Sequence, residues 1–184
     1  MHDLLHETLT LAQATGDRMG MLYAIEHLAY EAHSVGKQAE AERWFETFFT
    51  LSKEIGNVQG PARLYNALGR QAVSDGHWEQ AQCHFLAALR IAQQAHLAAA
   101  TLEALLGLAQ VYAHEGRSEA ALTLAWYVLH QPTCAQVTKK RAEPLYTALA
   151  SALPAEQLAL MQVQLQTKPL DVVAGELLAA YPLP

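Results

Sequence analysis

The sequence predicts an all-α fold built from a repeated pair of helices, on the basis of three observations. Hydrophobic residues make up 52% of the 184 residues, and they are mostly Ala and Leu, which favour helices. The chain holds only 10 Gly and 7 Pro, and it lacks the Val- and Ile-rich runs of a buried parallel sheet. The chain also matches itself when it is shifted by about forty residues, and a period of this size is typical of a repeat architecture.

The repeat consists of columns in which each residue has a physical role. Gly36, Gly76 and Gly116 fall in register and are expected to end the first helix of each pair, because a left-handed residue there costs glycine nothing. Gly69 is expected to be small because a neighbouring helix approaches closely at that point. The other columns in register are Ile25/Tyr65/Leu105, Leu28/Leu68/Leu108, Ala29/Gly69/Ala109, Ala41/Ala81/Ala121 and Phe45/Phe85.

The elements are expected in the following order. Apolar residues spaced by three or four, as in Tyr65, Leu68 and Ala72, mark one face of each helix. Pro144 lies inside one predicted helix and is expected to kink it. The predicted ranges are a lone helix at 3–15, helical pairs at 18–55, 58–95 and 98–130, a degenerate pair at 134–166 (helices 134–152 and 155–166) and a capping helix at 170–180, together one domain over 1–184.

Charge and composition exclude several classes of function. The net charge is −6, and the 12 basic residues are scattered, whereas a nucleic-acid-binding protein needs a basic face. The one basic cluster, Lys139-Lys140-Arg141, is interpreted as a solvated helix face. No apolar run reaches the roughly 20 residues of a membrane span. Cys83 and Cys134 are expected to be free, buried thiols, which predicts a cytoplasmic protein. The charge and the short apolar runs together predict that it binds neither nucleic acid nor membrane.

No pattern in the sequence predicts catalysis, a metal or a cofactor. His2 and His6 share a helix face, but no third zinc ligand lies near them in sequence. Cys83 and His84 are adjacent on a helix and point about 100° apart, so they form no nucleophile–base pair. No Walker loop surrounds Lys37. We therefore predict that the chain is not an enzyme.

The repeat columns resemble the tetratricopeptide (TPR) family. The second repeat carries the matching residues best, namely Tyr65, Leu68, Gly69, Ala72, Gly76, Ala81, Phe85 and Ala88. This resemblance implies a right-handed α-solenoid of antiparallel helix pairs that binds a protein or peptide segment on its concave wall. The longer repeat is similar to the C-terminal TPR arms of bacterial STAND-type signal-transduction ATPases, including maltose-activator-like regulators. It implies a sensor or scaffold arm, with the nucleotide chemistry in an upstream ATPase domain.

The predicted helix at 3–15 indicates that this chain is a fragment. It corresponds to the second helix of a repeat whose first half is missing, and its apolar face would normally rest on that partner. We expect an excised C-terminal domain, and a small natural protein is the alternative. The residues of this face are Leu4, Leu5, Thr8, Leu11 and Ala12.

Candidate contacts lie on the first helices, where side chains point away from the packing face. Tyrosine and arginine are the side chains most enriched at binding hot spots. The chaperone-binding TPR subclass is disfavoured, because Glu26 and Glu103 stand where it needs bases. The candidates are Tyr23, Glu26, His27, Tyr30, His33, Arg63, Asn66, Arg70, Glu103, Gln110 and His114.

Three functions therefore remain open. The first is a sensor arm of a larger signalling ATPase, the second is a freestanding TPR regulator that binds a short peptide, and the third is a structural assembly module. An upstream Walker motif in the same reading frame would separate the first from the other two.

Overall fold

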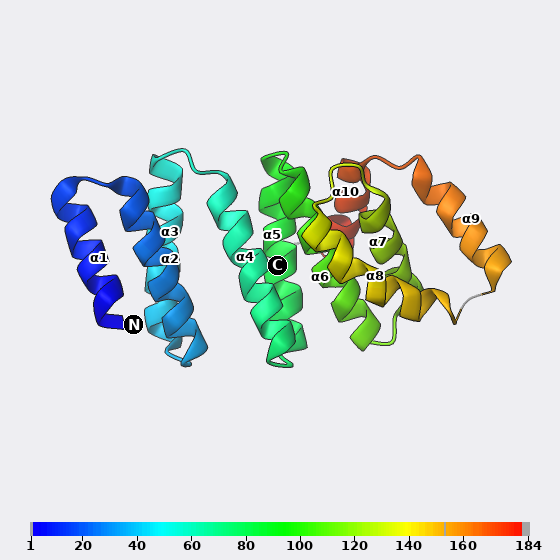
Figure 1. Ribbon diagram of the computed structural model, residues 1–184, viewed down its shortest axis with the longest axis horizontal. Coiled ribbons are helices and arrows are strands. Elements are labelled where there is room, and N and C mark those ends of the chain that lie inside the picture. The colour runs from blue at the N-terminus through cyan, green and yellow to red at the C-terminus, as the bar shows by residue number, and fades with distance from the viewer. Residues whose placement is uncertain (1, 153, 182–184) are drawn as a thin grey trace. The chain divides into compact units, whose positions relative to one another are not determined.

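The computed structural model describes residues 2–152 and 154–181. Within them the chain forms ten α-helices that pack sequentially in antiparallel pairs, which confirms the all-α prediction (Figure 1). No helix in this described part has the length and hydropathy that a membrane span needs. The helices are α1 (His2–Thr15), α2 (Arg18–Ser34), α3 (Gln38–Glu54), α4 (Gln59–Ser74), α5 (Trp78–Gln94), α6 (Ala98–His114), α7 (Ser118–His130), α8 (Gln136–Ala150), α9 (Ala155–Gln166) and α10 (Leu170–Ala180).

The turns between the first seven helices share one backbone conformation. Each contains a residue in the left-handed region, with φ between 52° and 78°. Five of these residues are glycines, and the sixth is His96, at φ 52°. Carbonyl groups at the helix ends that lack a partner within the helix accept hydrogen bonds from amides of the turn. The Lys37 amide, for example, donates to the Ala32 carbonyl oxygen at 2.9 Å. The glycines are Gly16, Gly36, Gly56, Gly76 and Gly116.

Because His96 holds a conformation that favours glycine, His96→Gly is expected to stabilise the fold. The left-handed region costs an ordinary residue about 1–2 kcal/mol, and the greater freedom of glycine in the unfolded chain offsets about half of that. We expect a net gain of about 0.5–1 kcal/mol in the free energy of unfolding, measured by urea denaturation. Gly76→His is the matched control, because a Cβ at Gly76 would meet no atom within 4 Å. It should lose a similar amount; a gain from both changes would contradict the backbone argument.

The contacts divide the chain into two compact units, residues 1–64 and residues 65–184, and the division falls within α4. In residues 1–64, α2 packs between α1 and α3. Asp17 caps α2 by accepting the Gly20 amide at 2.9 Å, and Asn57 caps α4 by accepting the Gly60 amide at 3.0 Å. These two caps explain why the stretches around Gly16 and Gly56 resemble each other.

The aromatic residue that fills the core of residues 1–64 is not the one expected. The repeat placed Phe45 in the aromatic column, yet Phe45 is only half-buried and Phe48, one turn later, is fully buried. The residues predicted to form an apolar face on the first helix, one without its partner helix, differ in exposure. Leu5 and Ala12 are buried, whereas Leu4 and Leu11 are 64% and 66% exposed.

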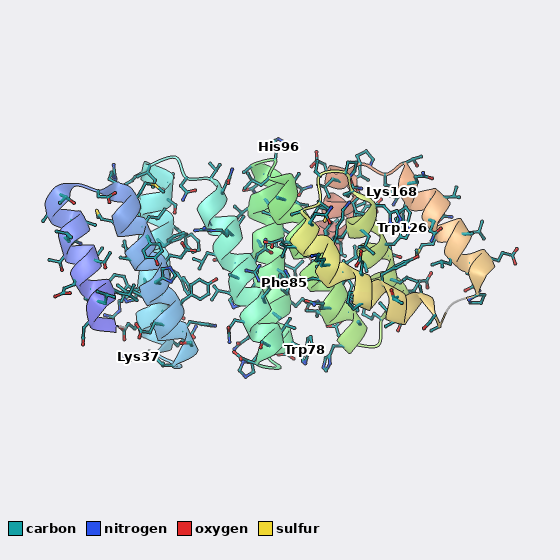
Figure 2. The ribbon with its side chains drawn as sticks, in the orientation of Figure 1. Lys37, Trp78, Phe85, His96, Trp126 and Lys168 are labelled. Atoms are coloured by element: carbon teal, nitrogen blue, oxygen red, sulfur yellow. The ribbon has the colours of Figure 1, made fainter. Side chains whose placement is uncertain are left out.

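In residues 65–184 the core is organised around Phe85 of α5, a 1% exposed ring (Figure 2). A Cβ built on Gly69 of α4 would lie 2.6 Å from this ring, and one built on Gly107 of α6 would lie 2.3 Å from it. The predicted close approach at Gly69 is therefore confirmed, and Gly107 provides a second, tighter one. Without side chains at either position, two helices can both reach the same aromatic ring.

The last three helices depart from the repeat. α8 continues through Pro144 to Ala150, and α10 packs back on α5. The Gln93 side-chain amide of α5 donates to the Asp171 carbonyl oxygen at 3.1 Å. Of the two cysteines predicted to be buried, Cys134 is buried but Cys83 is exposed.

Candidate functional site

In residues 1–64, the predicted binding side chains of α2 differ in how accessible they are. Tyr23 is 57% exposed, and its ring meets that of His27 edge to face, with 4.3 Å between the ring centroids. The Tyr30 hydroxyl donates to the Leu64 carbonyl oxygen at 3.3 Å, and His33 is half-buried. Tyr23 is therefore the exposed aromatic surface of this helix, while Tyr30 is bonded to the backbone of α4.

Glu26 and Arg63 form an ion pair between α2 and the first turns of α4. Arg63 Nη2 lies 2.7 Å from Glu26 Oε2, and the side chain of Glu26 is only 12% exposed. Arg63, by contrast, is 65% exposed and has donors left over for another acceptor. Glu26 thus orients a guanidinium that faces solvent.

In residues 65–184, one carboxylate lies between two arginines from different helices. Glu103 of α6 places Oε2 3.5 Å from Nη1 of Arg70 on α4, and Oε1 3.9 Å from Nη1 of Arg141 on α8. The three side chains are between 30% and 37% exposed, so solvent and ligands can reach them. We call Arg70, Glu103 and Arg141 the arginine cluster.

The arginine cluster carries an excess of positive charge in a partly desolvated place. Burial and, next, repulsion from Arg70 lower the pKa of Arg141, while Glu103 acts in the opposite direction. Lys139 is close enough to the neighbouring Cys134 thiol to lower its pKa, although burial, the larger effect, raises it. One carboxylate therefore faces two guanidiniums, with a further ammonium nearby, and the site can accept another anion.

These polar contacts have one geometry in common. Each joins a first helix to the first helix of the following repeat, as Glu26 joins Arg63 and as Arg70 joins Glu103. Residues of one stripe that were expected to face a ligand therefore also hold successive helices together. A partner that binds them must compete with these internal contacts.

Asn66 was predicted to point away from the packing face, and this is wrong. Asn66 is 0% exposed, and its Nδ2 donates to the Ala100 carbonyl oxygen at 2.9 Å. First helices pack on more than one side, so a stripe opposite the main core can still be buried. Gln110 is half-buried and His114 is exposed, its ring stacked on Trp78 with 4.0 Å between centroids.

Arg141 was missed as a site residue, because its cluster was interpreted as a solvated face. Lys140 does point to solvent, but Arg141 is half-buried against Glu103. A signal was present in the sequence: Arg141 lies four residues before Leu145, and residues at this spacing share a helix face. Since Leu145 falls in a core column of the repeat, Arg141 had to lie near the packing side.

No cluster suited to a metal ion is present among the described residues, in that no three His, Cys, Asp or Glu side chains come together. The side chain of His2, which was considered with His6 as a metal pair, lies outside the described part. The described residues do bring together one group of charged side chains from three helices, the arginine cluster of α4, α6 and α8. No model of a known protein family matches the sequence, and a search of curated proteins finds no match.

Proposed function

We propose that the chain is a TPR-like helical repeat that binds an acidic segment of a partner protein through Arg70 and Arg141. The observation that carries this proposal is the sharing of Glu103 by two guanidiniums from two other first helices. Arginine binds carboxylates through a planar pair of donors, which gives both affinity and orientation.

The distances within the cluster support the proposal. Charge-assisted hydrogen bonds between nitrogen and oxygen are about 2.7–2.9 Å long, whereas Nη1 of Arg70 and Nη1 of Arg141 lie 3.5 Å and 3.9 Å from the Glu103 oxygens. Each guanidinium therefore keeps most of its donors unsatisfied by Glu103. A carboxylate from a partner would gain two cations at once and would reduce the repulsion between Arg70 and Arg141.

Tyr23 and Arg63 of residues 1–64 are proposed as further contacts for the same class of partner. Both are exposed, and Glu26 already holds Arg63 in place. Tyrosine and arginine are enriched at binding hot spots, because each combines a large contact area with directional hydrogen bonds.

The resemblance of the repeat columns to TPR proteins supports a right-handed solenoid over the whole chain and a role as the sensor arm of a STAND-type ATPase. A reading frame that continues upstream through a Walker motif would support that role. A reading frame without one would favour the freestanding peptide-binding regulator or the structural assembly module.

The binding test compares a double variant with a matched control. Arrays of Glu- and Asp-rich peptides, each with a Gln- and Asn-substituted counterpart, identify an acidic probe whose affinity is then measured by fluorescence anisotropy. Arg70→Ala with Arg141→Ala is expected to weaken binding by on the order of 2–4 kcal/mol, or about 30- to 700-fold. Lys140→Ala removes an exposed charge next to Arg141 and should change the affinity little.

Two outcomes would overturn the proposal. One is a double variant that keeps its helical circular dichroism and binds the acidic probe as tightly as the native chain. The other is an equal loss in Lys140→Ala, because that would show a response to net charge and not to the cluster. Native binding should weaken as salt rises, since the contacts are partly exposed.

A further inference from the structure

In residues 1–64, one side of α1 is exposed, apolar and acidic. α1 packs on α2 through the opposite side, where Leu5, Leu9 and Ala12 are buried (Figure 1). Two leucines on one exposed helix face are typical of an interaction surface. The sequence of α1 contains Asp3 and Glu7 but neither Lys nor Arg, so the helix carries two negative charges. The exposed residues at spacings of three, four and three are Leu4, Glu7, Leu11 and Ala14, which we call the α1 stripe.

In residues 65–184, α8 has an exposed stripe with the same spacing and the opposite charge. α8 packs on α6 and α7, and its buried residues are Thr138 and Ala142. On the other side of the helix, Val137 is 69% exposed. Three cations of α8, Lys139, Lys140 and Arg141, outnumber its one carboxylate, Glu143. The exposed residues at spacings of three, four and three are Val137, Lys140, Pro144 and Thr147, which we call the α8 stripe.

The charges of the two stripes are available for a contact with another molecule. Within the described residues, neither Glu7 nor Lys140 forms an ion pair. α4 is the other helix with an excess of positive charge, but its two arginines are paired with Glu26 and Glu103. The α8 stripe therefore complements the α1 stripe in charge, in apolar character and in spacing.

We propose that α1 of one copy of this chain docks in parallel on α8 of a second copy. Spacings of three and four repeat the seam of a coiled coil, so each member of one stripe meets a member of the other. The charges determine the direction, since an antiparallel alignment would place Lys140 against Leu11. The layers of the parallel alignment are Leu4 with Val137, Glu7 with Lys140, Leu11 with Pro144 and Ala14 with Thr147.

The contact is expected to be weak. α1 has 14 residues and α8 has 15, so the two helices match in length, but one pair of helices buries less surface than a standard protein interface. We expect a dissociation constant between roughly 10 μM and 1 mM. Neither Arg70 nor Arg141 belongs to a stripe, so this inference does not rest on the proposed function.

Sedimentation equilibrium of the native chain, without any peptide, tests the proposal. The average mass should exceed the 20.2 kDa of one copy and rise with concentration. Glu7→Lys and Lys140→Glu each bring like charges together and should weaken association about three- to tenfold. A 1:1 mixture of these two variants brings opposite charges together again and should associate as the native chain does.

Two controls separate this contact from other causes of association. Glu46→Lys makes the same change of charge as Glu7→Lys at an exposed position of α3 and should not weaken association. Both changes make the net charge of −6 less negative, so a general repulsion between copies would predict stronger association for both. Arg70→Ala with Arg141→Ala should leave association unchanged, whereas a loss would show that α1 binds the arginine cluster and would overturn the α8 contact.

Other results would overturn the proposal as well. One is a mass that stays at 20.2 kDa up to about 1 mM protein. Another is native association in Glu7→Lys or Lys140→Glu, and a third is a mixture of the two that associates no better than either alone. Circular dichroism should show native helicity in every variant, because all four single changes and the mixture alter side chains that are exposed or half-buried.

Discussion

Gly107→Leu is expected to destabilise the protein by about 3 kcal/mol or more. A Cβ at Gly107 would already lie 2.3 Å from the Phe85 ring, and that ring is buried on all sides. Overpacking a closed core costs typically about 1–3 kcal/mol and more where nothing can move. Glycine in a helix is itself unfavourable by about 1 kcal/mol. At a position with open space around it, replacing glycine by leucine would therefore stabilise the protein.

The measurement for Gly107→Leu is the free energy of unfolding by urea denaturation, and a second variant isolates the cause. Phe85→Ala removes the ring that the new side chain would meet. Combined with Gly107→Leu it should be more stable than the sum of the two single losses predicts, because the leucine fills the vacated space. Strict additivity of the two changes would show that they do not share a space and would contradict the packing described for Phe85.

Phe48→Ala is expected to cost about 3–5 kcal/mol, the range measured for truncated core phenylalanines. Phe48 is 0% exposed, and its ring would lie 3.2 Å from a Cβ on Gly60. In repeat proteins stability depends on neighbouring elements, so the loss should be local. Amide hydrogen exchange should accelerate more in residues 1–64 than in residues 65–184.

Phe45→Ala is the matched comparison for Phe48→Ala, because Phe45 is half-buried one turn away. We expect it to cost clearly less than Phe48→Ala. A larger loss of stability in Phe45→Ala than in Phe48→Ala would show that Phe45 is the core aromatic residue, as the repeat suggested. A uniform acceleration of exchange over the whole chain would instead contradict local stability.

The sequence was sufficient to predict the helices, because periodicity and turn glycines are local signals. Gly36, Gly76 and Gly116 marked three turns directly, and the helix bounds followed from them. His96 stands at an equivalent turn without the glycine, so composition alone did not show that its backbone is left-handed. Only the regular spacing of the turns could have indicated it.

The site was harder to predict than the fold, because polar identity does not determine exposure. Asn66 was taken to face a ligand, yet it bonds to the next first helix, and Arg141 was taken to face solvent, yet it lies against Glu103. Phe45 and Phe48 show the same difficulty among apolar residues. They lie three apart, so a period of 3.6 places both near one face without saying which one enters the core.

The seating of Phe85 has a consequence for recombination between repeats. Its ring requires glycine on both α4 and α6, so α5 is specific to its two neighbours. In register, Gly107 corresponds to Ala67 and Thr147, and Phe85 corresponds to Phe45 and Ala125. The helix pairs of this protein are therefore similar modules that are not interchangeable. A chain with shuffled or duplicated helix pairs would have to keep Gly69, Phe85 and Gly107 together.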